Sequence, residues 1–104
     1  MQINYKQQDN KLIAELSGEL DHHTAEKVRK SLDRIVASTQ PQELIVEMSG
    51  VTFMDSSGLG VILGRYKKMN EHGGIMKIAN PQGHAESIMR MSGVFSIIEK
   101  CSEY

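Results

Sequence analysis

The sequence is poor in cysteine, proline and aromatic residues: it has one cysteine, Cys101, two prolines, no tryptophan, three tyrosines and two phenylalanines. A single cysteine excludes an internal disulfide and a multi-cysteine metal site, and it is typical of a reducing compartment. No apolar run approaches the ~18–20 residues that a membrane-spanning helix needs, and the first residues lack the apolar core of a signal peptide. We therefore expect a cytoplasmic protein with no membrane partner.

An excess of one charge is missing as well. Twelve lysines and arginines face thirteen acidic residues, which leaves a formal net charge of -1. The basic residues are scattered and no aromatic ladder accompanies them, so the electrostatic signature of a nucleic-acid-binding protein is absent. Nucleic acid is not an expected partner. The 104 residues suit one domain, residues 1–104, that buries roughly 60–65% of the surface of the unfolded chain.

What the sequence does contain is an alternation of strand and helix patterns after an initial hairpin. We expect strands at Gln2–Lys6, Leu12–Ser17, Glu43–Met48, Ile75–Ala79 and Val94–Glu99. Helices are expected from His22 or His23 to Ala37 with Asp21 or Thr24 as cap, from Asp55–Ser57 to about Glu71, and from Asn80 to Met91. This pattern predicts the α/β class, with a mixed, mostly parallel sheet of about five strands whose N-terminal strand is antiparallel.

Two polar connections should meet at one edge of this sheet. Residues 18–24 and 49–57 each follow a strand, and open α/β sheets bind their ligands and partners at the carboxyl ends of parallel strands. Asp21 and Ser57 should therefore be near neighbours. Since Ser57 stands where a helix begins, unpaired backbone N–H groups there favour negative charge, and its hydroxyl is a suitable acceptor for a phosphoryl group.

Three glycines follow Ser57, and each lowers helix propensity by about 1 kcal/mol relative to alanine. Gly60 and Gly64 share one helix face and suit packing on the sheet. Gly58, in the first turn, is expected to leave room for an approaching partner. Leu59 either adds an apolar contact at the same place or belongs to the core. A turn with a helix cap and no further role is the simplest alternative for Asp55-Ser56-Ser57-Gly58.

Other chemistries fit the residues less well. The glycine pattern departs from a dinucleotide fingerprint, because its last glycine is one residue late and no acidic residue follows Ile75–Ala79. Ser57 with His22 or His23 and an aspartate has the residue types of a hydrolase triad, but the G-x-S-x-G elbow is absent. Adjacent helical histidines point about 100° apart and do not easily share a metal ion. We expect no cofactor, no metal and no enzymatic activity.

Three segments resemble the STAS family of anti-sigma factor antagonists: GELDHHTA from Gly18, FMDSSGLGVILGRYK from Phe53 and MSGVF from Met91. The resemblance implies a STAS domain that acts as an anti-anti-sigma factor in sporulation. In that family the second serine of Asp-Ser-Ser-Gly is phosphorylated by a partner anti-sigma factor that is also an ATP-dependent serine kinase. That serine is similar in position to Ser57.

The same resemblance implies how the chain works. The unphosphorylated form is expected to bind the nucleotide-bound anti-sigma factor, which releases the sigma factor. Phosphorylation is expected to end this binding, and a serine phosphatase is expected to restore the unphosphorylated form. Glu19 and Asp21 are implied to contact a basic residue of the kinase. His22, Asp55, Ser56, Gly58 and Leu59 are expected at the same surface. A STAS module that binds a nucleotide or another small ligand is the alternative.

The resemblance also implies a C-terminal helix after the last strand. The sequence ends at Tyr104, five residues after Glu99, so either the chain is shortened or this member covers that face of the sheet differently. We therefore expect apolar surface to be exposed on the sheet.

Overall fold

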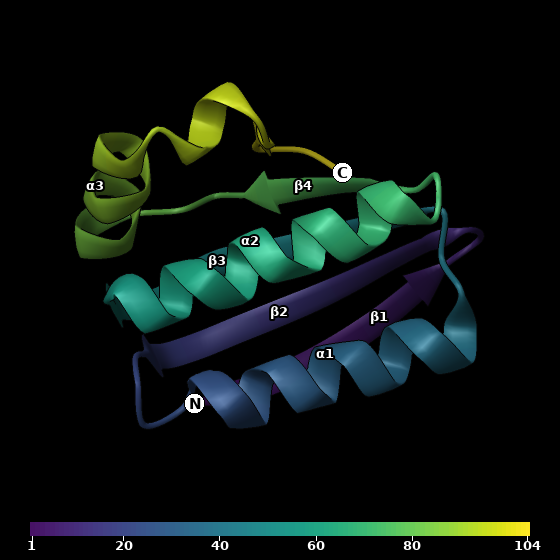
Figure 1. The fold of residues 1–104 in the computed structure, drawn as a ribbon, viewed down its shortest axis with the longest axis horizontal. Helices are drawn as coiled ribbons and strands as arrows, with labels where there is room; N and C mark the ends of the chain where they lie inside the picture. The colour runs from purple at the N-terminus through teal and green to yellow at the C-terminus, as the bar shows by residue number, and fades with distance from the viewer.

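The computed structural model describes residues 1–104 as a five-stranded sheet with three α-helices (Figure 1). The strands are β1 (Gln2–Gln8), β2 (Lys11–Leu20), β3 (Glu43–Met54), β4 (Ile75–Ala79) and β5 (Glu99–Cys101). The helices are α1 (Ala25–Thr39), α2 (Ser56–Glu71) and α3 (Gly83–Ser92), followed by a short 3-10 turn, η1 (Val94–Ser96). None of the helices is long and apolar enough to cross a membrane.

The strands lie in chain order across the sheet. β1 pairs antiparallel with β2 around a tight turn in which Asp9 has a positive φ of 55°, and the β2–β3, β3–β4 and β4–β5 pairs are all parallel. A parallel pair needs a crossover, and the three helices supply these crossovers. The predicted α/β fold, its mixed sheet and its antiparallel first strand are confirmed.

The main core lies between the sheet and the helices. Figure 1 shows α1 and α2 side by side over one face of the sheet, with α3 near the end of β4. Alternation along β2 directs Leu12, Ala14 and Leu16 into this core and Ile13 to the opposite face. Leu44 to Met48 of β3 are all buried, as expected for a strand covered on both faces. Fully buried members of the core include Leu12, Leu16, Leu32, Leu44, Ile62 and Met89.

Both polar connections are shorter than the sequence pattern predicts. β2 continues through Gly18 to Leu20 and β3 continues through Gly50 to Met54, with two register shifts between them. Gly18 adopts a φ of +107°, and a Cβ at Gly50 would lie 2.8 Å from the Cβ of Ser17. Glycine and serine are typical of loops in a sequence, but here they allow bulges within a continuous strand pair.

Two further boundaries were wrong. α1 begins at Ala25, because residues 22–24 form a turn in which the N–H groups of Thr24 and Ala25 are donated to the carbonyl of Asp21. The apolar run Val94–Glu99 is not a strand. Its first three residues form η1, Val94 and Ile98 are buried, and only Glu99–Cys101 pairs with β4. A short apolar run indicates that some of its side chains are buried, but it does not by itself distinguish a strand from a turn.

The second face of the sheet is better covered than expected. Ile13, Ile45 and Ala79 form a small cluster on this face, are each at most 2% exposed, and Cys101 packs against them. Beside the cluster, Glu47 Oε2 accepts hydrogen bonds from Asn80 Nδ2 at 2.8 Å and from the Tyr104 hydroxyl at 3.2 Å. Burial acts to raise the pKa of Glu47, but these bonds and those from Ser49 together lower it. The last residues of the chain therefore bind to the strand next to this cluster.

The glycines of α2 do not have the roles predicted for them. Gly58 is buried, and a Cβ there would collide with the carbonyl oxygen of Leu20 and lie 2.8 Å from Leu20 Cγ. Its missing side chain therefore makes room for the end of β2, and the interpretation of Gly58 as clearance for a partner was wrong. A Cβ at Gly60 or Gly64 would meet nothing within 4 Å, so neither residue serves packing on the sheet.

This difference predicts opposite effects of the same substitution. Gly58→Ala should lower the free energy of unfolding by about 1–3 kcal/mol, because the backbone of β2 must move. Gly60→Ala should raise it by about 0.5–1 kcal/mol, because alanine favours the helix and has open space there. Urea unfolding of the two variants and the parent chain measures both changes. Equal destabilisation by the two would contradict the assigned close approach at Gly58.

Candidate functional site

The amino ends of α1 and α2 lie together at one edge of the sheet (Figure 1). Leu20 and Met54, the last residues of β2 and β3, are register partners, and both helices begin just after them. We call this edge, made of residues 19–24 and 55–58, the rim. The two polar segments, which contain Asp21 and Ser57, were predicted to meet at the carboxyl ends of neighbouring parallel strands. This prediction is confirmed.

Asp55 joins the two halves of the rim. Its Oδ1 accepts hydrogen bonds from the backbone N–H groups of Ser57 at 2.9 Å and Gly58 at 3.1 Å, so it is the N-cap of α2. Its Oδ2 accepts the backbone N–H of His22 at 3.1 Å and lies 3.5 Å from His22 Nδ1. The bond from Gly58, with those from His22 and Ser57, lowers the pKa of Asp55 below its ordinary value.

Asp21, one of the two residues expected to cap the first helix, binds backbone N–H groups at the entry to α1. The residue is 9% exposed, and its Oδ1 accepts the backbone N–H groups of His23 at 2.9 Å and Thr24 at 3.2 Å. These bonds shape the turn that leads into α1, where the cap position, Thr24, makes no side-chain cap bond. Glu19, the other acidic residue of this segment, is exposed.

Ser57 lies in the first turn of α2 and is half-buried, whereas Ser56 is exposed. Ser57 lines a shallow depression of about 370 Å³ between α1 and α2, with Ala25, Glu26, Arg29, Gly60 and Val61. Leu59 is half-buried and packs against the core, which favours its structural interpretation. Because Asp55 already takes the N–H groups of Ser57 and Gly58, these two amides are not free to hold a phosphate, contrary to the expectation from helix position alone.

Four residues near the rim were not assigned to the site from the sequence: Arg29, Gly60, Phe53 and His84. Arg29 and Gly60 share the depression with Ser57; Gly60 belongs to the quoted segment from Phe53, but Arg29 lies outside the three quoted segments. Phe53 is 39% exposed and stacks on His84, with ring centroids 4.6 Å apart. The Nδ1 of His84 accepts the backbone N–H of Met54 at 3.3 Å. Since Phe53 and His84 stand 31 positions apart, only the tertiary fold brings them together.

The shared carboxylate predicts a pH-dependent contribution to stability. A lowered folded-state pKa means that the contribution of Asp55 is present above the ordinary aspartate pKa of about 3.9 and is lost as the pH falls through the folded value. Asp55→Ala should therefore be less stable than the parent chain at pH 7, with the gap closing as the pH is lowered from about 5 toward 3. Asp55→Asn keeps an acceptor without the charge and should lie between the two at pH 7. Urea midpoints across this pH range measure the gap, and a gap independent of pH would rule out the charged cap.

Comparison with known proteins assigns this architecture to a family. The model of the STAS domain matches residues 2–103. The chain is 42% identical over 98 residues to the anti-sigma F factor antagonist of Paenibacillus polymyxa, covering 94% of this chain and 84% of that protein. It is 29% identical over 97 residues to the anti-sigma-B factor antagonist of Bacillus subtilis, covering 93% of this chain and 87% of that one.

Two solved structures share the fold and a quarter of the sequence. The anti-sigma factor antagonist SpoIIAA in its unphosphorylated form matches with a TM-score of 0.82 at 25% identity, over 98% of this chain and 90% of that chain. The Bacillus cell fate determinant SpoIIAA in the phosphorylated form matches with a TM-score of 0.75, also at 25% identity, over 98% of this chain and 93% of that chain. The chain therefore belongs to the STAS domain family.

Proposed function

We propose that this chain is an anti-sigma factor antagonist that is switched off by phosphorylation of Ser57. In its unphosphorylated form it binds an anti-sigma factor that is itself a serine kinase carrying ADP or ATP, and this binding releases a sporulation sigma factor. A serine phosphatase restores the active form. The chain is a substrate of the kinase and has no catalytic role of its own, and residues 1–104 act as one cytoplasmic domain.

One observation carries this proposal: Ser57 lies at an open depression and its backbone is held by Asp55. A kinase needs an accessible hydroxyl at a defined position, and the N-cap bond together with the first turn of α2 defines that position. The relatives support the same function, since two of them are antagonists of anti-sigma factors and the similar SpoIIAA has been seen in a phosphorylated form.

The charge of the rim explains how a phosphate would act as a switch. Phosphorylation adds about -1.5 to -2 charges at Ser57, in the same first turn as the Asp55 carboxylate. At about 4 Å a pair of unit charges is worth roughly 1 kcal/mol in water and about 4 kcal/mol at an effective dielectric constant of 20. A phosphate that meets an acidic group of the partner would therefore weaken binding by orders of magnitude. No change of fold is needed for this exclusion.

The acceptor assignment predicts the behaviour of two neighbouring serines. Ser57→Ala should abolish phosphate incorporation by the cognate anti-sigma kinase and leave binding to the ADP-bound kinase largely intact, because the Asp55 cap binds the backbone. Ser56→Ala, the matched control at the exposed neighbour, should still be phosphorylated. Incubation with ATP and mass spectrometric site mapping test both variants. A phosphate found on Ser56 would refute the assignment.

The exposed acid of the rim predicts a binding effect that is independent of phosphorylation. Glu19→Gln should weaken the affinity for the ADP-bound kinase by about fivefold or more, because a charge contact is lost. For the same reason, the affinity of the variant should depend less on salt concentration than that of the parent chain. Glu99→Gln removes an equally exposed carboxylate on β5, away from the rim, and should leave the affinity unchanged. Calorimetric titration at two salt concentrations gives both values. Equal weakening by the two variants would show a general charge effect.

A further inference from the structure

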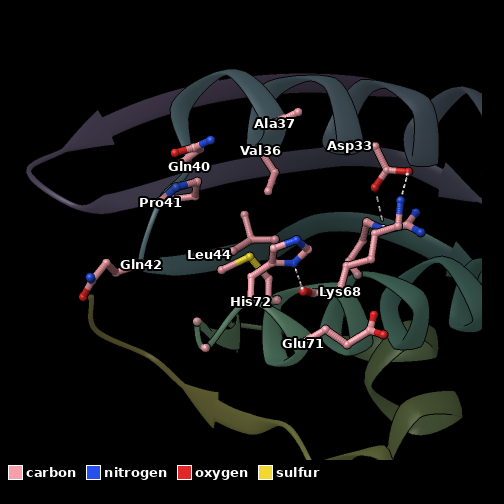
Figure 2. A pocket seen from close by; sticks show the side chains of 14 residues that line it. Asp33, Val36, Ala37, Gln40, Pro41, Gln42, Leu44, Lys68, Glu71 and His72 are labelled. Carbon is pink, nitrogen blue, oxygen red and sulfur yellow. Dashed lines mark hydrogen bonds and ion pairs between the residues drawn. The ribbon is translucent and has the colours of Figure 1, made fainter.

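A second hollow lies between α1 and α2 at the end of the helix pair away from the rim. It is a cavity of about 670 Å³, within the size range of small-molecule sites. Figure 2 shows Val36 of α1 and Leu44 of β3 on either side of this space, with His72 beside Leu44. Gln40, Pro41 and Gln42 border it from the connection between α1 and β3 (Figure 2).

The cavity contains a buried guanidinium that the chain leaves incompletely paired. The side chain of Arg65 is 7% exposed, and its Nε lies 3.0 Å from Asp33 Oδ1. The N–H of Nε is not directed at that oxygen, and both Nε and Nη1 are buried without a hydrogen-bond partner. A buried charged donor without an acceptor costs free energy, so an acceptor brought to this guanidinium would be stabilising.

Asp33 cannot satisfy Arg65 fully, because it is shared. Its Oδ2 lies 3.2 Å from Lys68 Nζ and 3.7 Å from Arg29 Nη1, so three cations surround one carboxylate. Glu26 offsets part of the charge of Arg29 at 3.8 Å. Glu71, at the end of α2, also borders the cavity. A positive excess therefore remains on the side of the cavity formed by Arg65 and Lys68.

The helix termini do not cancel this excess. Both helices present their carboxyl ends to the cavity, and a helix dipole disfavours an anion there only within its last turn. Arg65 and Asp33 stand more than one turn before the ends of α2 at Glu71 and of α1 at Thr39, whereas Lys68 lies in the last turn of α2, where a cation is favourable. The last turns of α1 and α2 contribute Val36 and Met69 to the apolar part of the cavity, beside Leu44 of β3.

We propose that this cavity binds a small organic anion. Its carboxylate or phosphate group accepts hydrogen bonds from Arg65 and Lys68, and its apolar part packs on Val36, Leu44 and Met69. Charged hydrogen bonds to a guanidinium and an ammonium fix the headgroup, and burial of the apolar part supplies affinity. This site is separate from Ser57 and does not rest on the proposed function.

Hexanoate, hexyl phosphate, hexanol and inorganic phosphate are suitable probes of this site, each titrated into ¹⁵N-labelled full-length chain and followed by amide chemical shifts. Hexanoate and hexyl phosphate should shift the amides of Val36, Leu44 and His72 in a saturable manner, with little change at Ser57. Their relative affinities identify the preferred headgroup. Hexanol, which lacks the charge, should bind at least tenfold more weakly than the anions. Inorganic phosphate, which lacks the apolar part, should bind more weakly as well.

Variants with opposite expected signs test the role of charge. Lys68→Gln should raise the dissociation constant for hexanoate about fivefold or more. Asp33→Asn should lower it, because it removes the carboxylate that competes for Arg65 and Lys68. Lys67→Gln removes a neighbouring exposed lysine that does not line the cavity, and should leave it unchanged. Asp33→Asn removes the partner of the buried Arg65, so a urea unfolding curve of each variant verifies that the measured chain is folded.

Three outcomes would overturn the proposal. Equal binding of hexanol and hexanoate would show an apolar groove without an anion site. Equal weakening by Lys68→Gln and Lys67→Gln would show non-specific charge attraction. The anions are tested up to 50 mM, a concentration on the order of ten times a dissociation constant of a few millimolar. If no anion then gives saturable shifts at Val36, Leu44 and His72, the cavity does not bind this class of ligand.

Discussion

The carboxylate of Asp55 is the contact on which the arrangement of the rim depends. One of its oxygens caps α2 and the other holds the backbone of His22, so a single side chain connects segments 33 residues apart in the sequence. A capping bond alone would position Ser57 relative to its own helix. The second bond also positions the turn before α1, and with it the exposed Glu19 and the buried Asp21. Ser57 and the acidic segment 19–21 therefore form one surface of fixed geometry.

Close approach of backbones supports this contact. Gly58 allows the end of β2 to approach the first turn of α2, and without that approach His22 would not reach Asp55 Oδ2. Gly18 and Gly50 let β2 and β3 continue through bulges to the same edge. Each glycine lowers intrinsic helix or strand propensity, and each cost is offset by a long-range contact that only a residue without a side chain permits.

The sequence was sufficient for the order of the strands and for the meeting of the two polar segments, because both follow from hydrophobic periodicity and the geometry of parallel sheets. The sequence was insufficient where the role of a residue depends on a contact with a residue far away in the sequence. Gly58 and Gly60 are equivalent in a local pattern and differ only because Leu20 lies against the first. Asp21 and Asp55 were both expected at the partner surface, and the carboxylate of each binds backbone N–H groups. The stacking of Phe53 on His84 has no local signal.

A chain of ion pairs along the groove between α1 and α2 connects the rim to the cavity. Arg29 shares the depression with Ser57 and lies 3.7 Å from Asp33, which in turn lies 3.0 Å from Arg65 and 3.2 Å from Lys68. A phosphate on Ser57 would compete with Asp33 for Arg29. Asp33, released from one cation, would bind Arg65 and Lys68 more strongly and leave them less available to an anion in the cavity. Since coupling between two sites is reciprocal, an anion bound at Arg65 would in the same way disfavour the phosphorylated rim. The two ends of the helix pair would therefore be linked through the shared carboxylate of Asp33.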